Sequence, residues 1–525
     1  MEDLITRSVK PKGGGSSGQP FRRPVEPLRR EWPGTARNPK RSRLAMKPAD
    51  PTRRTPFFLT PVIVACALFM ENLDSTVLAT SLPAIAADLG EDPIALKLAL
   101  TSYLLSLAVF IPASGWMADR FGARTVFRAA IVVFTLGSIA CGVSSTLPQF
   151  VLARVLQGAG GAMMTPVGRL VVLRSVSRAE LVRALAWLTT PALLGPVIGP
   201  PLGGFITTYF HWRWIFWINV PIGVVGVALV SAYIGDIRDE SAPPLDRLGF
   251  LLSGAGLASL MFGLSIVGRG FAPGWVVAGL IAAGAVLLMA YLSHARRAPH
   301  PILDLRLFGH RTFRVSVLGG ALFRIGLGAI PFLLPLLFQA GFGLSPFQSG
   351  LLTFLSTVGA MAMKPTAGPI LKRFGFRAVL IGNTFVSALF FCFNAGFRPT
   401  TPHLLIAAVL MVGGFFRSLQ FTALNAIAYA EVSDREMSRA TSLSSVAQQL
   451  SLSVGVTLGA AALDLSRWVR GDSGLHAADF APAFLLVAAM SLSSLFFFRT
   501  LPDEAGAEIA GRAGATARTP PRATE

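Results

Sequence analysis

Long apolar stretches of roughly 20 residues recur along most of the chain, from Pro56 to Arg499. A helix of that length crosses the hydrocarbon core of a bilayer, where every backbone polar group must be bonded within the protein. The strands of membrane barrels alternate apolar and polar residues, and these stretches do not. Only 14% of the residues are charged, against about 25% in soluble domains. The sequence therefore predicts an all-α membrane protein.

Apolar runs between turn signals predict fourteen membrane-spanning helices. We expect them at residues 57–84, 95–117, 124–143, 148–173, 184–208, 213–235, 248–267, 273–294, 312–338, 347–370, 376–395, 402–428, 437–464 and 479–499. Because this number is even, both termini are expected on the same side of the membrane.

Basic residues are unequally shared between the loops of the two sides. The loops on the side of the termini are rich in arginine, whereas the other side carries chiefly Arg213, Arg269, Arg398, Arg467 and Arg470. Loops with excess positive charge face the cytoplasm, so both termini are predicted to be cytoplasmic. Because the net charge of +20 is spread over these loops and the N-terminal tail, we expect no nucleic-acid partner.

A weak internal repeat divides the chain into two halves of the same orientation. GWMADRFGAR at 115–124 is echoed by GPILKRFGFR at 368–377, and ALFMENL at 67–73 by ALFRIGL at 321–327. Parallel repeats place a substrate site between the halves near the middle of the membrane. The predicted organisation is a disordered basic tail (1–55), a six-helix half (56–235), two inserted helices (236–300), a second six-helix half (301–500) and a disordered tail (501–525). Translation from Met46 is an alternative to a start at Met1.

Several motifs in the expected order resemble one transporter family. LDSTVLATSLP (73–83), GWMADRFGAR, RVLQGAGG (154–161), GPVIGPPLGG (195–204) and WRWIFWINVPIG (212–223) are similar to motifs of the major facilitator superfamily, in its fourteen-helix drug:proton antiporter branch. The resemblance extends from about Pro56 to Arg499. It implies two six-helix halves plus two extra helices.

The resemblance also implies a function. It suggests a proton-coupled exporter of lipophilic, often cationic, drugs in the bacterial inner membrane, with lipid, protons and a small-molecule substrate as its partners. In relatives from double-membrane bacteria, a periplasmic adaptor and an outer-membrane channel complete the export route. Alternatives are a dedicated exporter of one metabolite, a transporter-like sensor and a membrane-embedded enzyme.

Two carboxylates lie inside the first predicted helix. Glu71 and Asp74 are three residues apart, hence on one helix face. A charged group within the bilayer is costly and usually marks a functional path, so both are candidates for proton coupling. A structural hydrogen bond to a neighbouring helix is the alternative.

Two arginines are candidates for the same path. The fourth-helix motif of the family places Arg154 in proton coupling, and an arginine keeps its charge at any working pH. An interfacial arginine that reaches the headgroups is the alternative. Arg324 sits in the internal repeat at the depth where the first half has Met70 or Glu71, and is expected to face the central cavity, against Glu71 or Asp74.

Two further segments are candidates for gating. In the turn after the second helix, Asp119 is expected to pair with Arg120 and Arg124 close by, or with a helix N-terminus, and to latch the two halves in one state. The residues assigned to this turn are Gly115, Asp119, Arg120, Gly122 and Arg124. A role of its arginines in topology alone is the alternative. In the fifth helix, small residues and prolines predict a bent, tightly packed gate, assigned to Gly195, Gly199, Pro200, Gly203 and Gly204.

No motif in the sequence points to an enzyme or to a cofactor. No lysine directly follows a glycine, so a phosphate-binding loop of the glycine-lysine type is absent, and no H-E-x-x-H metal motif occurs. The three cysteines, Cys66, Cys141 and Cys392, lie in apolar helices, where buried packing is expected.

Overall fold

The fold is described from a computed structural model. It covers residues 58–176, 180–235, 244–267, 272–433, 436–471 and 474–510. The predicted tail 1–55, the alternative start at Met46 and residues 511–525 lie outside the described residues.

The described residues are helical, without a β-strand. The first half comprises α1 (Leu59–Leu89), α2 (Lys97–Phe121), α3 (Ala123–Val143), α4 (Leu147–Ser175), α5 (Leu181–Tyr209), α6 (Trp214–Trp217) and α7 (Asn219–Tyr233). The inserted helices are α8 (Arg247–Ile266) and α9 (Gly274–Arg297). The second half comprises η1 (Leu305–Gly309), α10 (Arg311–Arg314), η2 (Val315–Gly319), α11 (Gly320–Leu336), η3 (Leu337–Gly341), α12 (Pro346–Ala362), η4 (Lys364–Thr366), α13 (Ala367–Phe374), α14 (Phe376–Ala395), α15 (His403–Ile427), α16 (Met437–Arg470), η5 (Ala477–Asp479), α17 (Phe480–Ser493) and α18 (Leu495–Phe498).

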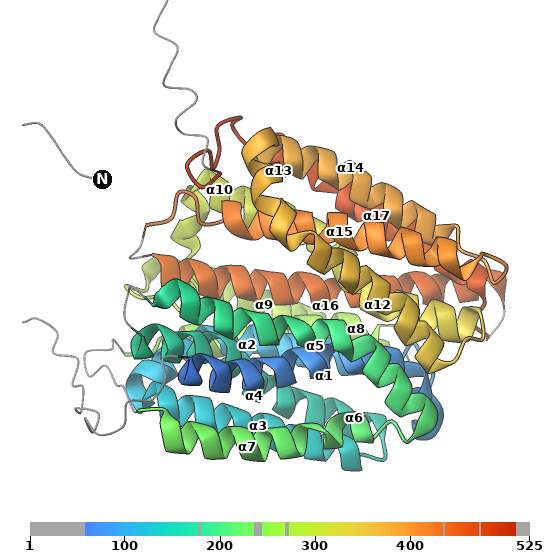
Figure 1. The fold of residues 1–525 in the computed structure, drawn as a ribbon, viewed down its shortest axis with the longest axis horizontal. Helices are drawn as coiled ribbons and strands as arrows, with labels where there is room; N and C mark the ends of the chain where they lie inside the picture. Colours follow the sequence, from blue (N-terminus) through green and yellow to red (C-terminus); the bar gives the residue numbers. More distant parts are fainter. Residues whose placement is uncertain are drawn as a thin grey trace, which may run out of the picture. The chain divides into compact units, whose positions relative to one another are not determined.

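These helices confirm the predicted fold class. Among the described residues, eleven helical segments are long and apolar enough to cross a membrane. Beside them, α4 packs on α2 and α3, α5 packs on α1, and α12 packs on α15 and α5. With α4, α5 and the α12–α13 pair, a helix or a run of helices stands at each of the fourteen predicted spans. Figure 1 shows the long helices running side by side.

Small residues bring neighbouring helix backbones into direct contact. A Cβ atom at Gly160 of α4 would lie 2.5 Å from the backbone nitrogen of Phe134 in α3. In the second half, a Cβ at Gly328 of α11 would lie 2.4 Å from the carbonyl oxygen of Leu452 in α16. Lipid tails are as apolar as leucine, so close van der Waals packing of this kind holds membrane helices together.

The backbone repeats where the sequence repeats. Gly122, between α2 and α3, has φ +92°, and Gly375, between α13 and α14, has φ +79°. Glycine adopts this region without the steric penalty that a Cβ brings. The spacing of these two glycines equals that of Gly115 and Gly368 in the two turn motifs. Both copies of the turn therefore have glycine where the chain must reverse between helices.

The two halves touch through helices far apart in sequence. α5 packs on α12 and α2 packs on α16, while α1 contacts α11 and α12. The inserted pair α8 and α9 pack on each other, and α8 also packs on α2. The residues between the halves are thus contributed by α1, α2 and α5 on one side and by α11, α12 and α16 on the other.

The segment after the last helix is more ordered than the sequence predicts. Disorder is expected from residue 501, yet Leu501 is buried and Asp503 forms an ion pair with Arg377 of α14. Ala505 and Ala510 pack against the core of the second half. Small apolar residues interspersed with Pro and Gly carry a weak signal for order, and here a surface of α14 and α15 is available to cover them.

We expect the Gly160→Leu variant to unfold at a lower temperature than the wild type, because the leucine side chain would separate α3 from α4. Overpacking of this kind costs about 1–3 kcal/mol. Thermal unfolding in detergent measures the effect. The control is Gly279→Leu in α9, where a Cβ would meet no atom within 4 Å. Equal melting temperatures of the two variants would contradict the close α3–α4 crossing.

Candidate functional site

A buried ion pair joins α1 to α4. The Nη1 of Arg154 lies 2.7 Å from the Oδ2 of Asp74. Arg154 is 0% exposed and Asp74 is 3% exposed. Removing two charges from water costs several kcal/mol per ion unless geometry and further hydrogen bonds compensate. The structure thus brings together two residues that the sequence analysis proposed separately.

Neutral polar side chains from two other helices complete the bonding of Asp74. Its Oδ1 accepts from the Nε2 of Gln157 (α4) at 2.8 Å and from the Nδ2 of Asn219 (α7) at 3.0 Å. Gln157 and Asn219 also donate to the Oγ of Ser138 in α3, at 2.7 and 3.2 Å. Both amides are fully buried. The hydrogen-bond network around Asp74 therefore joins four helices: α1, which carries Asp74, and α3, α4 and α7.

The sequence analysis did not assign Gln157 or Asn219 to the site. Both lie within motifs that it quoted, RVLQGAGG and WRWIFWINVPIG. The available signal was an amide inside an apolar helix, since polar side chains within the bilayer usually have bonding partners there. That signal does not say which partner an amide meets.

One nitrogen of Arg154 has no partner in the described structure. Its Nε donates to the backbone oxygen of Ala99 in α2 at 3.2 Å, and its Nη1 also donates to Gln157. The guanidinium lies over the ring of Tyr103, with its Cζ 4.3 Å from the ring centroid. The buried Nη2 has no hydrogen-bond partner. A buried donor of this kind is ready to bind an acceptor that enters the site.

Arg154 lines a cavity between the two halves. The cavity has a volume of about 310 Å³ and is lined by α1, α2, α4 and α5 from one half and by α11, α12 and α16 from the other. Among the described residues that line it, Arg154 is the one charged side chain. Most of the other residues are apolar, with hydroxyl groups from α1 and α12. This is the place between parallel repeats where transporters of this architecture bind substrate.

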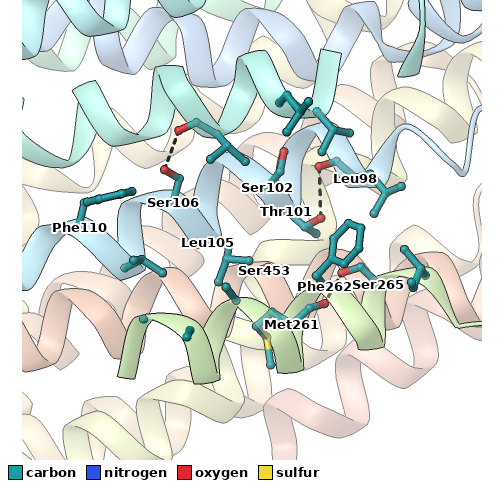
Figure 2. Close-up of a pocket in the computed structure, with 18 of the residues that line it drawn as sticks. Leu98, Thr101, Ser102, Leu105, Ser106, Phe110, Met261, Phe262, Ser265 and Ser453 are labelled. Atoms are coloured by element: carbon teal, nitrogen blue, oxygen red, sulfur yellow. Dashed lines mark hydrogen bonds between the residues drawn. The ribbon is translucent and has the colours of Figure 1, made fainter. Parts of the chain in front are cut away.

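A second, larger cavity of about 790 Å³ lies between α2, α4 and the inserted helix α8. Figure 2 shows that the hydroxyls of Thr101, Ser106 and Ser265 in its lining bond backbone oxygens of the helices. The Oγ of Ser106 donates to the oxygen of Val155 at 2.7 Å, and that of Ser265 to the oxygen of Met261 at 2.8 Å. The Oγ of Ser453 is the one hydroxyl of this described lining that is buried without a hydrogen-bond partner, and the lining carries no charged residue, so the cavity offers a mainly apolar surface. We therefore place the candidate site in the smaller cavity.

Glu71 does not share the network of Asp74. Although the two carboxylates lie on one helix, Glu71 accepts a hydrogen bond from Thr165 of α4 at 3.0 Å. Its side chain is only partly buried. Any role of Glu71 in proton coupling would therefore act through its contact with Thr165 and not through the network of Asp74.

Arg324 lies away from both carboxylates of α1. It is 0% exposed, and its Nη2 donates to Asn425 of α15 at 3.0 Å. Its Nη1 donates to the backbone oxygen of Ser316 at 3.4 Å. The structure does not bring it opposite Glu71 or Asp74, because α15 supplies its partner. That hypothesis rested on the position of Arg324 along its helix, compared with the equivalent helix of the first half. Such a position does not determine in which direction the side chain points.

The turn after α2 makes its ion pair within one half. Asp119 lies 2.7 Å from the Nη2 of Arg174, at the end of α4. Arg124 donates to the backbone oxygen of Ser231 in α7, while Gly115 and Arg120 are exposed. The expectation that Asp119 pairs with Arg120 or Arg124 and latches the halves to each other does not match these contacts. The carboxylate reaches α4 because α2 and α4 pack together along their length.

The small residues of α5 face two different helices. A Cβ at Gly203 would lie 2.5 Å from the oxygen of Val77 in α1, and Gly195 and Gly199 approach α1 similarly. By contrast, a Cβ at Gly204 would lie 2.4 Å from the oxygen of Pro346, at the start of α12. Likewise, a Cβ at Gly350 of α12 would lie about as close to the oxygen of Pro200 in α5. The proposed α5 gate is thus packed against the first half and the second half at once.

Polar contacts also join the halves at this end of the helices. The Nη1 of Arg467 in α16 lies 2.6 Å from the Oδ2 of Asp92, in the loop between α1 and α2. Gln339 donates to the backbone oxygen of Thr80 at 2.9 Å, and the backbone nitrogen of Phe347 donates to Thr208 at 3.1 Å. The halves are therefore held together at the end opposite the arginine-rich turns.

Side chains of the types that bind metal ions do not cluster within the described residues. Within the part of the chain that the structure describes, no group of three or more His, Cys, Asp or Glu side chains could hold a metal ion. Cys141 is buried, whereas Cys66 and Cys392 are exposed at helix surfaces. The prediction of buried packing is thus confirmed for Cys141 and wrong for the other two.

Comparisons with known proteins agree on one family. The model of the Major Facilitator Superfamily matches residues 64–303 and 316–523. A protein of Escherichia coli O6:H1 with the provisional name multidrug resistance protein MdtD is 39% identical over 451 residues, which cover 85% of this chain and 95% of that protein. Its namesake from Salmonella typhimurium is 40% identical over 449 residues, covering 84% and 94%.

Solved structures show the same fold at low sequence identity. A D-xylose-proton symporter aligns with a TM-score of 0.63 at 14% identity, covering 86% of this chain and 99% of its own. An auto-inhibited peptide transporter of the POT family aligns with a TM-score of 0.63 at 17% identity, covering 85% and 97%.

We expect Asp74→Leu to destabilise the protein by about 3–5 kcal/mol, because it leaves the charge of Arg154 buried without a counter-ion. The double variant Asp74→Leu/Arg154→Met should be markedly more stable than Asp74→Leu alone, since it buries neither charge. Thermal unfolding in detergent compares the wild type, the single variants Asp74→Leu and Arg154→Met, and the double variant. A double variant as unstable as the sum of the two single variants would show that the ion pair has no energetic coupling.

Proposed function

Because the chain belongs to the major facilitator superfamily, we propose that this transporter is a proton-coupled antiporter that exports lipophilic small molecules by alternating access. Curated relatives that are 39–40% identical are named for multidrug resistance. The largely apolar cavity between the halves suits lipophilic compounds.

The buried pair of Asp74 and Arg154 is the observation that carries the proposal. Arg154 keeps its proton at any working pH, so only Asp74 can change charge within the pair. A proton on Asp74 would cancel the attraction and leave the guanidinium free to turn toward the cavity that it already lines. Proton binding and the state of the cavity would then be linked through one side chain.

Rocking of the two halves would expose the cavity to each side in turn. In the described state, the ion pair of Asp92 with Arg467 and the α5–α12 packing join the halves at one end. We propose that these contacts break when the transporter opens at that end. These contacts differ from the ion pair of Asp119 with Arg174, which lies within one half and so does not hold the two halves together.

The arginine-rich ends of the helices belong, in this proposal, in the cytoplasm of a bacterial cell. The positive-inside rule supports this orientation and places both termini on the same side. The protein would then lie in the inner membrane and take up substrate from the cytoplasm or the inner leaflet. A periplasmic adaptor and an outer-membrane channel would complete export in a double-membrane bacterium.

We expect Asp74→Asn to abolish substrate transport driven by an imposed pH gradient in proteoliposomes, because the amide cannot take up and release a proton. The protein should still fold, since an amide can replace part of the hydrogen bonding. The control is Asp88→Asn on the same helix, whose carboxylate pairs with Arg213 at the surface. Unchanged gradient-driven transport by Asp74→Asn would remove this residue from the coupling mechanism.

We expect a short thiol-specific crosslinker between cysteines at positions 92 and 467 to stop transport, because it would hold the halves together at one end. The variant Asp92→Cys/Arg467→Cys is made after replacement of the three native cysteines. Cleavage of the linker should restore transport. The control pairs Asp92→Cys with Trp468→Cys, whose native side chain is 79% exposed. Full transport by the crosslinked protein would show that this contact does not open during the cycle.

A further inference from the structure

We propose that the cavity between the halves binds an organic anion, with its negatively charged group at Arg154 and at Ser356, behind which Arg417 lies. This inference rests on the proposed export function and gives its substrate a charge. The compound would carry a carboxylate, or a similar acid group, on an apolar body. The sign of its charge follows from which buried charges of the described structure are already neutralised.

Arg154 supplies the first half of the anion site. It lines the cavity with a fully buried guanidinium, and its Nη2 lacks a hydrogen-bond partner. Its other nitrogens are engaged with Asp74, Gln157 and the backbone of Ala99. One donor therefore remains for an acceptor from outside the protein, and a carboxylate oxygen is a strong partner for it.

Arg417 supplies the second half from the other half of the protein, where it lies behind Ser356, outside the cavity lining. It lies near the middle of α15 and is only 5% exposed. Its Nη2 donates to the Oγ of Ser356 at 2.5 Å, and Ser356 of α12 lines the cavity. The Nη1 is buried without a partner, and among the described residues no carboxylate lies within ion-pair distance. A residue in mid-helix is too far from the headgroups to reach them.

Further positive charge in the second half is also uncompensated by acids. Arg324 bonds to Asn425 and to a backbone oxygen, and Lys364 lies 3.4 Å from the hydroxyl of Thr422. Asn425 is eight residues from Arg417 and so lies near the same face of α15. The described hydrogen-bond partners of Arg324, Lys364 and Arg417 are therefore all neutral, and of these three cations Arg324 and Arg417 are buried whereas Lys364 is exposed. A buried cation with neutral partners retains much of its desolvation cost, which an anion would offset.

The two acids of α1, Glu71 and Asp74, offer little to a cationic substrate in this cavity. Both oxygens of Asp74 already accept hydrogen bonds, and Glu71 is bonded to Thr165 and is not among the residues that line the cavity. A cation in the cavity would instead meet the charge of Arg154. The electrostatics thus favour an anion over a cation of the same shape.

The rest of the lining fits the body of such a compound. Pro196 and Pro200 of α5 face Pro331 and Leu334 of α11 across the halves, and Thr353 adds a hydroxyl from α12. An apolar body would contact the prolines and leucine, while the acid group meets Arg154 and Ser356. Exchange of one proton inward for one monoanion outward also moves net positive charge inward, so a membrane potential that is negative inside should drive it.

Three probes with one naphthylbutyl skeleton test the charge: the carboxylate, the alcohol and the ammonium compound. We measure their binding to the purified protein, and their transport in proteoliposomes under a pH gradient with and without a potassium–valinomycin potential. We expect the carboxylate to bind at least tenfold more tightly than the other two. Its transport should also respond to the potential. Preferential binding and transport of the ammonium compound would overturn the anion site and leave proton-coupled export intact.

Variants locate the site. Arg417→Gln should weaken binding of the carboxylate at least tenfold, with little effect on the alcohol, and Arg417→Lys should recover part of the loss. Arg398→Gln, at the exposed end of the α14–α15 loop, is the matched control. Equal carboxylate affinity of the wild type and Arg417→Gln would overturn the assignment. Should Arg417→Gln fail to fold, Ser356→Ala tests the same contact. Tight carboxylate binding without gradient-driven transport would support the site and contradict the export function.

Discussion

The ion pair of Asp74 with Arg154 is the interaction around which the first half is built. It lies inside the membrane-spanning region with almost no exposure, where a charge without a partner would be very costly. Its compensation requires Gln157, Asn219 and Ser138, and hence α3, α4 and α7 around α1. Because Arg154 also lines the inter-half cavity, the same charge that orders this half can respond to what enters between the halves.

Close backbone contacts give the charges their positions. α5 approaches α1 through Gly195, Gly199 and Gly203, and α12 through Gly204. Since apolar side chains gain little by leaving lipid for protein, such contacts and buried hydrogen bonds carry the association of the helices. The α5–α12 contact is therefore both a packing interface and a part of the closure at one end, together with the pair of Asp92 and Arg467.

The two halves share a backbone plan and differ in their electrostatics. Glycines with positive φ follow α2 and α13 at equivalent positions. In the first half the buried arginine has a carboxylate partner, whereas Arg324 and Arg417 of the second half have neutral ones. The binding site that we propose between such halves would be asymmetric: one side would link charge to a proton, and the other would hold cations that a substrate could neutralise.

The sequence by itself determined the fold class and the approximate places of the helices, because lipid demands long apolar stretches and permits few charges within them. Their limits were decided by the structure, in which α1 ends at Leu89 and α16 at Arg470, beyond the expected ends at 84 and 464. Its motifs also indicated Asp74 and Arg154 as unusual, since charged side chains in hydrocarbon need a reason. Which groups meet was decided only by the tertiary structure. The pairing of Asp119 with Arg174 and of Arg324 with Asn425 depends on how helices turn and pack, and helical periodicity does not report the partner. The same holds for Gln157 and Asn219, whose amides became part of the site only when four helices enclosed one carboxylate.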